Sequence, residues 1–209
     1  PYAPVSAAYS TVSQDYGKLR HILNVLTPGL VFAASASGYG RAITATVPAD
    51  VPVVLTEGQI DGRATRSFDD LLATVATAQV DAAHAQVGPD TIAKFLFTSG
   101  STKLPKGVIN TQRMLCANQQ QILQCFPGLG QVRPVLVDWL PWNHTFGGNH
   151  NVGLTIYNGG TLYIDEGKPT PALISETLRN LREIAPTVYF NVPKGFEEIA
   201  AAMDTDTVL

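Results

Sequence analysis

The stretch FLFTSGSTKLPKGV, residues 95–108, constrains this chain more than any other segment. Residues 93–97 are mostly apolar and predict a short buried strand, and a second strand is expected over residues 107–110. Four hydroxyl side chains lie on the abrupt turn between them, where Gly100 lets neighbouring N–H groups point into one concavity. Lys106 adds a mobile positive charge that suits a phosphate group. The segment therefore indicates a site for nucleotide phosphates or, on composition alone, an ordinary polar loop.

A second candidate site is the segment WLPWNHTFGG, residues 139–148, which follows a predicted strand. Ligands of open α/β sheets bind at the carboxyl ends of strands, so His144 is placed to meet a substrate. Trp142 and Phe146 could wall an apolar acyl group, and Asn143 could add a polar contact. In the alternative interpretation, His144 caps the following helix and the aromatic side chains belong to the core.

Strand-like and helix-like segments alternate along the rest of the chain, which predicts an α/β fold with mostly parallel sheets. The polar stretch over residues 79–90 is the best boundary, and it divides the chain into subdomains over residues 1–88 and 89–209. A turn over residues 35–40 could hold an anion, but without a lysine an ordinary turn is the simpler interpretation. Helices are expected over residues 13–26, 68–78, 112–126, 145–157 and 170–184 and from residue 193, and the remaining strands over residues 30–34, 52–56, 134–138, 160–164 and 187–190.

Composition excludes some partners and indicates others. Hydrophobic residues make up 45% of the 209 residues and charged residues 15%, below the usual value of about 25%, which is consistent with surfaces that something else covers. The net charge of −3 without a basic block argues against nucleic acid as the main partner. No apolar run approaches the roughly 18 residues of a membrane span. Together with the absence of a signal peptide, this leads us to expect a cytoplasmic protein.

The two cysteines, Cys116 and Cys125, fall in one predicted helix. Nine residues of helix separate them by about 13 Å, whereas a disulfide needs Cα atoms within about 7 Å. We therefore expect two reduced, small core residues, and only a minor alternative makes either a catalytic thiol. His144 and His150 do not have the spacing of a helical metal pair, and no cluster predicts structural zinc, so no metal site is expected.

The remaining titratable side chains predict no further site. His21 and His84 are interpreted as surface residues. Asp165 and Glu166 end a predicted strand and are interpreted as solvated turn carboxylates rather than as an acid/base pair.

The motif T-S-G-S-T-x-x-P-K-G closely resembles the phosphate loop of the adenylate-forming superfamily, which includes acyl-CoA synthetases, adenylation domains and luciferases. WLPWNHTFGG is similar to the aromatic and histidine motif beside the acyl pocket of these enzymes. The segments PYAPVSAAYS, VDWLPWNHTFGGNHN and YNGGTLYIDEGKPTP most resemble the feruloyl-CoA synthase branch. One position departs from the pattern: Lys103 stands where the superfamily usually has glycine, and it either faces solvent or adds a cation near the phosphates.

The resemblance implies an acid–CoA ligase that uses ATP, Mg²⁺ and coenzyme A and acts on a small-molecule carboxylic acid. Ferulate or a related hydroxycinnamate is favoured by the branch resemblance, with another aryl acid or a fatty acid as alternatives. It implies His144 as the catalytic residue. The implied phosphate-binding residues are Thr98, Ser99, Gly100, Ser101, Thr102, Lys106 and Gly107, and the implied acyl-pocket residues are Trp142, Asn143, Thr145, Phe146 and Gly147.

The resemblance also leads us to expect a piece of a longer ligase, because the superfamily's later motifs, including Y-G-x-T-E and the domain with the catalytic lysine, do not occur in these 209 residues. We expect these residues alone to be inactive in forming acyl-CoA. Bare sheet edges could also cause self-association. A non-catalytic nucleotide-binding or regulatory module that reuses the same loop is the alternative from another functional class.

Overall fold

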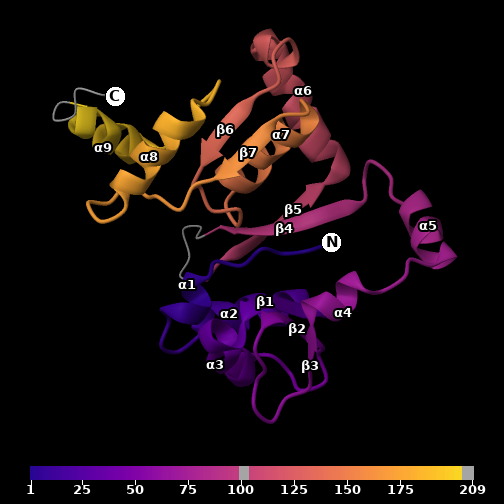
Figure 1. Cartoon of the computed structure of the whole chain (residues 1–209). Helices are drawn as coiled ribbons and strands as arrows, with labels where there is room; N and C mark the ends of the chain where they lie inside the picture. The colour runs from indigo at the N-terminus through magenta and orange to yellow at the C-terminus, as the bar shows by residue number, and fades with distance from the viewer. Residues whose placement is uncertain (99–103, 204–209) are drawn as a thin grey trace. The chain divides into compact units, whose positions relative to one another are not determined.

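The computed structural model describes residues 1–98 and 104–203. They form two compact units, Pro1–Ile109 and Asn110–Leu209, and each is described by itself (Figure 1). The mixed α/β fold with parallel sheets that the sequence predicts is confirmed in both units. The subdomain boundary at residue 88 stays a prediction.

The first unit contains a three-stranded parallel sheet in the order β1-β2-β3 (Figure 1). Helix α3 packs on β1, and its Ile43, together with the C-cap residue Val47, joins Val53, Leu55 and Ile60 in the core. The first three residues of β2 are all buried, so both faces of the sheet are covered at this strand, and Val53 and Leu55 point into the core that α3 covers. The strands are β1 (Val31–Ser35), β2 (Val53–Glu57) and β3 (Thr65–Ser67), and the helices are α1 (Ala8–Thr11), α2 (Gly17–Leu26), α3 (Ala36–Thr46), α4 (Phe68–Leu72) and α5 (Ala78–Ala85).

The helix predicted over residues 68–78 is shorter than expected. The Ser67 hydroxyl caps α4 by accepting from the Asp70 N–H, but the helix ends at Leu72. A second helix, α5, occupies part of the stretch that was interpreted as a polar boundary. Residues 71–87 are all exposed, so no packed apolar face extends α4, and tertiary packing provides most of the stability of a helix.

Strands form on both sides of the predicted phosphate loop, as expected: β4 (Ile92–Thr98) and β5 (Lys106–Thr111), which pair with each other. Tyr2 lies beside β4 in parallel, with its N–H on the Ala93 carbonyl and its carbonyl accepting from the Phe95 N–H. Lys94 is the buried charge of β4: its ammonium lies 5.9 Å from the Tyr2 ring centroid. Burial lowers the pKa of Lys94.

The second unit is organised around the parallel pair β6 and β7 (Figure 1). In this pair Asp138 lies opposite Ile164. Leu136, Leu129 and Leu154 form its buried core. The Thr111 hydroxyl caps α6 by accepting from the Met114 N–H. The elements are α6 (Gln112–Cys125), the 3₁₀ helix η1 (Pro127–Gly130), β6 (Val135–Asp138), the π-helix η2 (Phe146–Asn151), α7 (Val152–Tyr157), β7 (Thr161–Ile164), α8 (Ile174–Ile184) and α9 (Pro193–Met203).

Two predictions for this unit are wrong. The helix expected from Thr170 begins at Ile174, because the Thr170 carbonyl closes a turn by accepting from the N–H groups of Leu173 and Ile174. Residues 187–190 do not form a strand: the Thr187 and Val188 N–H groups both donate to the Val135 carbonyl, which replaces a regular ladder.

Candidate functional site

Three of the predicted phosphate-binding residues lie at the end of β4 and the start of β5. Thr98 is the exposed last residue of β4, and Lys106 is the exposed first residue of β5. Gly107 follows on β5, where an added Cβ would lie 3.4 Å from the Phe97 ring. The rest of the predicted set, Ser99, Gly100, Ser101 and Thr102, lies outside the described residues, as does Lys103.

His21 holds the segment that enters β5, a contact that sequence reasoning missed. Its Nε2 lies 2.9 Å from the carbonyl oxygen of Pro105, whose side chain is fully buried. His21 is half-buried on α2, so its interpretation as a surface residue is wrong, whereas His84 is exposed as predicted. The two hydrogen-bonded residues are 84 positions apart in the chain, and no local pattern connects them.

The segment after β6 makes a turn that only glycine can occupy. A Cβ on Gly147 would lie 2.7 Å from the carbonyl oxygens of both Leu140 and Pro141, closer than real Cβ contacts come. A Cβ on Gly148 would overlap the Trp142 carbonyl oxygen. The glycine pair therefore lets the backbone of η2 press against the loop that carries the candidate acyl-pocket residues.

The helix predicted over residues 145–157 forms, but its first part is the π-helix η2 rather than an α-helix. Single π turns within α-helices are rare and occur frequently at functional sites. Phe146 and Gly147, both predicted for the acyl pocket, lie in this turn. Trp142, Asn143 and Thr145 lie in the loop before it.

His144 is exposed, and its ring is held by the turn that follows. Its Nδ1 accepts a hydrogen bond from the Phe146 N–H at 3.2 Å, so in the neutral imidazole the proton is on Nε2. This contact fits the helix-cap interpretation. The other half of that interpretation is wrong for Trp142, because its side chain is 48% exposed and is not part of the core.

Three amide side chains, the buried Asn110 and Gln119 and the half-buried Asn149, connect the end of β5 to η2. The Asn149 Nδ2 donates to Asn110 Oδ1 at 2.8 Å and to Thr145 Oγ1 at 3.3 Å. Gln119 of α6 donates to the Asn149 carbonyl at 3.0 Å. The Thr145 hydroxyl next to His144 is thus oriented by a residue of the π turn.

Two carboxylates lie at the ends of the neighbouring strands β6 and β7, Asp138 as the last residue of β6 and Asp165 directly after β7, and they differ in their hydrogen bonds. Asp165 is buried and accepts from the Gly167 N–H, Thr177 Oγ1 and Asn180 Nδ2 at 2.6–2.8 Å. Its interpretation as a solvated turn carboxylate is therefore wrong, because α8 supplies two of its donors, whereas Glu166 is exposed.

Asp138 is also buried, and its Oδ1 accepts a hydrogen bond from the Leu140 N–H. In the part of the chain that the structure describes, its Oδ2 has no partner, and neither has Nδ2 of Asn151. Burial raises the pKa of Asp138, and the nearby Asp165 charge adds to this rise. The hydrogen bond to Leu140, the Asn151 amide and the His150 ring oppose it.

A polar chain runs from this cluster toward the last helix. Trp139 Nε1 donates to Asn191 Oδ1 at 3.1 Å, and Asn191 Nδ2 donates to the Tyr189 hydroxyl at 2.8 Å. Burial raises the pKa of Tyr189 to about 12, so this phenol stays neutral at physiological pH.

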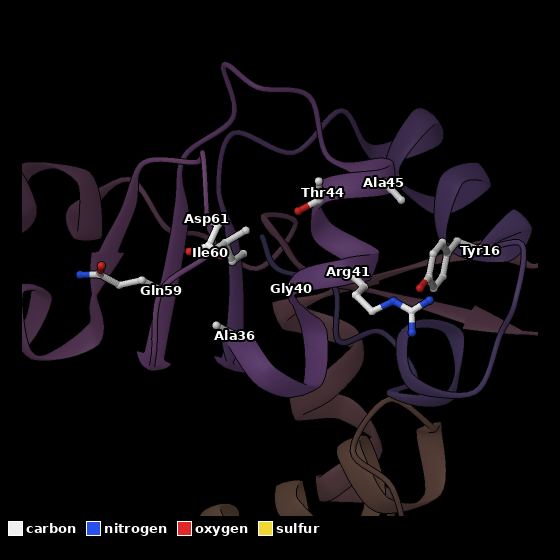
Figure 2. Close-up of a pocket in the computed structure, with 9 residues that line it drawn as sticks. All are labelled: Tyr16, Ala36, Gly40, Arg41, Thr44, Ala45, Gln59, Ile60 and Asp61. Atoms are coloured by element: carbon white, nitrogen blue, oxygen red, sulfur yellow. The ribbon is translucent and has the colours of Figure 1, made fainter.

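The first unit contains a shallow hollow of about 530 Å³ along α3. Figure 2 shows the side chains of Tyr16 and Arg41 on one side of it and Gln59 on the other. The hollow reaches Ala36 and Gly40, which lie in α3. The Ser35 hydroxyl caps this helix by accepting from the Gly38 N–H at 3.2 Å, so the prediction of a turn over residues 35–40 is wrong, because residues 36–40 begin α3.

Cys116 and Cys125 are free thiols, as predicted, but both are exposed, so their interpretation as core residues is wrong. Over residues 1–98 and 104–203, no group of three or more His, Cys, Asp or Glu residues could hold a metal ion. No helix within these ranges combines the length and apolar character needed to cross a membrane.

Comparison with known proteins identifies the family to which these sites belong. A family model described as "AMP-binding enzyme" matches residues 2–208. Over 146 residues the chain is 29% identical to a propanoyl:CoA ligase of Rhodococcus jostii (strain RHA1), whose acyl group carries a 7a-methyl-1,5-dioxo-octahydro-1H-inden-4-yl ring system. That match covers 65% of this chain and 28% of the relative, so the chain spans little more than a quarter of the relative's length.

Solved structures share the fold. ATP-bound MatB from Rhodopseudomonas palustris superimposes with a TM-score of 0.69 at 22% identity, covering 95% of this chain and 35% of that chain. A malonyl-CoA ligase in a ternary product complex with methylmalonyl-CoA and AMP superimposes with a TM-score of 0.62 at 21% identity, covering 91% of this chain and 35% of that chain.

Proposed function

The chain belongs to the AMP-binding enzyme family, and we propose that the polypeptide containing it is an ATP-dependent acid–CoA ligase. The observation that carries this proposal is the turn after β6, where the Phe146 N–H fixes the His144 ring with its Nε2 as a donor beside an exposed Trp142. Such a donor can bind the oxygen of a carboxylate or of an acyl phosphate, and the aromatic side chains can line the acyl group.

In the proposed first step, a carboxylate oxygen bonds to the α-phosphorus of ATP while the bond from that phosphorus to the pyrophosphate oxygen breaks. The protein's contribution is positioning and charge neutralisation. Thr98, Lys106 and Gly107, with residues 99–102, are proposed to bind the β and γ phosphates. Mg²⁺ would arrive with ATP, because this ion binds mainly through substrate phosphates and waters. The sulfur of coenzyme A then bonds to the acyl carbon and AMP leaves.

Ferulate or a related hydroxycinnamate is the proposed acid, because Trp142 and Phe146 flank His144 in sequence and suit an aromatic acyl group. The Rhodococcus jostii relative, a CoA ligase for a ring-bearing acid, is consistent with a bulky acyl group. ATP in one structural neighbour, and methylmalonyl-CoA with AMP in another, are consistent with the proposed co-substrates.

The test is ATP–pyrophosphate exchange with a panel of hydroxycinnamic, other aryl and fatty acids. We expect exchange with hydroxycinnamates by the polypeptide that contains residues 1–209, and none by residues 1–209 alone. Exchange with fatty acids only would keep the ligase and replace the proposed substrate. ATP binding without exchange for any acid would contradict the ligase and favour a non-catalytic nucleotide-binding module.

A further inference from the structure

A second histidine of the π turn, His150, is held between two aromatic rings. Its ring lies edge-on to Phe146, with centroids 5.4 Å apart, and edge-on to Phe190, with centroids 4.7 Å apart, each at an interplanar angle of 80°. The side chain is half-buried. Packing on both sides fixes the plane of the imidazole, so its two nitrogens have defined surroundings.

The tautomer of His150 follows from its neighbour. Nδ1 lies 2.8 Å from Asn151 Oδ1, and an amide oxygen can only accept, so Nδ1 carries the proton. The Asn151 amide also lies near the buried Asp138 carboxyl. A flipped amide would bring two oxygens together at a buried position.

The neutral His150 ring therefore presents Nε2 as a hydrogen-bond acceptor. None of the residues described by the structure donates to this nitrogen. His144 has the opposite polarity, since its Nδ1 accepts from the Phe146 N–H and its Nε2 is a donor. One turn of the chain thus carries a donor imidazole and an acceptor imidazole on either side of Phe146 in the sequence.

We propose that His150 is a specificity-determining residue, which accepts a hydrogen bond from a hydroxyl group on the acyl part of the substrate and so selects hydroxylated acids. This inference rests on the proposed ligase function and deepens it. A site that offers a half-buried acceptor discriminates against an acid without a donor, because binding that acid leaves the acceptor desolvated and unpaired. The hydroxyl of a hydroxycinnamate is a donor of this kind.

The experiment compares a hydroxycinnamic acid with the acid in which a methyl group replaces the hydroxyl, which has nearly the same size and no donor. The readout is the ratio of the two kcat/KM values in pyrophosphate exchange, measured on the polypeptide that contains this chain. We expect the unmodified protein to favour the hydroxylated acid by about tenfold or more. A ratio near one would overturn the proposal.

Two variants assign the effect to the residue. His150→Phe keeps a ring between Phe146 and Phe190 and removes the acceptor, so the ratio should fall to about one while the methyl-substituted acid is used about as well as before. His150→Gln retains an acceptor oxygen and should keep part of the preference, and His84→Phe, at an exposed position, should keep all of it. An unchanged ratio in His150→Phe, or a lost preference in His84→Phe, would contradict the proposal.

Failure of the ligase function is distinguishable from failure of this inference. Absence of exchange with every acid would contradict the ligase alone. The affinities of the two acids, measured through the change in fluorescence of Trp139 and Trp142 on binding, would then test whether His150 selects the hydroxylated acid. Equal affinities would overturn it, and tighter binding of the hydroxylated acid, lost in His150→Phe, would support it.

Discussion

The strands around the phosphate turn leave their candidate ligand-binding side chains exposed, whereas the turn after β6 holds its candidate residues by close backbone packing. Thr98 and Lys106 are exposed at the ends of β4 and β5. In the turn after β6, by contrast, Gly147 and Gly148 are buried and leave no room for a Cβ. The chemistry of the first region lies in side chains that contribute little to the fold, while in the second the backbone path itself sets the position of His144.

This difference predicts how each region responds to substitution. A side chain at an exposed strand end can be removed with little loss of stability, so its effect appears in activity alone. A residue that permits close backbone packing cannot be changed without moving that backbone, so stability and activity change together. Three substitutions test this contrast, in order of decreasing expected effect.

The largest effect is expected for Lys106→Met, which removes the cation proposed to neutralise the phosphates. The rate of pyrophosphate exchange should fall by about 100-fold to 1000-fold, the usual cost of losing one preorganised electrostatic contact to a transition state. The free energy of unfolding, measured in urea, should change by less than about 0.5 kcal/mol because the side chain is exposed.

The matched control for Lys106 is Lys168→Met, which removes another exposed lysine and should leave both quantities unchanged. Full exchange activity in Lys106→Met would contradict the proposed phosphate role. A large loss of stability would contradict the contrast between the two regions.

The next effect is expected for Gly148→Ala. The added methyl group would overlap the Trp142 carbonyl oxygen, and backbone cannot give way as a flexible side chain can. We expect the free energy of unfolding to fall by about 1–3 kcal/mol, as for other overpacked interiors. Exchange activity should fall with it, because the displaced segment contains His144.

Gly128→Ala is the control for this substitution, since no described atom lies within 4 Å of the Cβ it would add. Its free energy of unfolding should stay within about 0.5 kcal/mol of the unmodified protein. An equally stable Gly148→Ala protein would show that the loop before η2 adapts freely. Substitutions in the two regions would then no longer differ in their effect on stability.

The same contrast explains how much the sequence could predict. The strands on either side of the phosphate turn and the caps of α4 and α6 by Ser67 and Thr111 follow from residue types that act over a few positions, and the structure confirms them. The parallel sheets also follow, since strands that alternate with helices return in the same direction. Features that depend on short-range chemistry were therefore predictable.

The features that sequence reasoning missed depend on contacts between distant parts of the chain. The burial of Asp165 requires donors from Thr177 and Asn180, and His21 meets a carbonyl 84 residues away. The π turn depends on glycines whose space is set by the carbonyls of the preceding loop. The glycine pair after His144 was a signal for close packing, but it does not distinguish a π turn from an α turn.

The smallest effect is expected within the second region, where Asp138→Asn tests the under-bonded carboxyl at the end of β6. The folded-state pKa of Asp138 is raised above its ordinary value of 3.8, mainly by burial. Between these two values the unfolded chain has released the proton and the folded chain retains it. The stability of the unmodified protein therefore falls as pH rises through this interval, by at most about 1.4 kcal/mol for each pH unit.

Asparagine cannot ionise, and its oxygen can still accept from the Leu140 N–H. The free energy of unfolding of Asp138→Asn, relative to the unmodified protein, should therefore increase as the pH is raised from about 4 and become constant above the folded-state pKa. Urea unfolding at a series of pH values measures this difference. A difference that stays constant or decreases with pH would show that the Asp138 carboxylate is fully compensated in the folded state. The packed region would then resemble the exposed one, because ionisation of its buried carboxyl would not lower the free energy of unfolding.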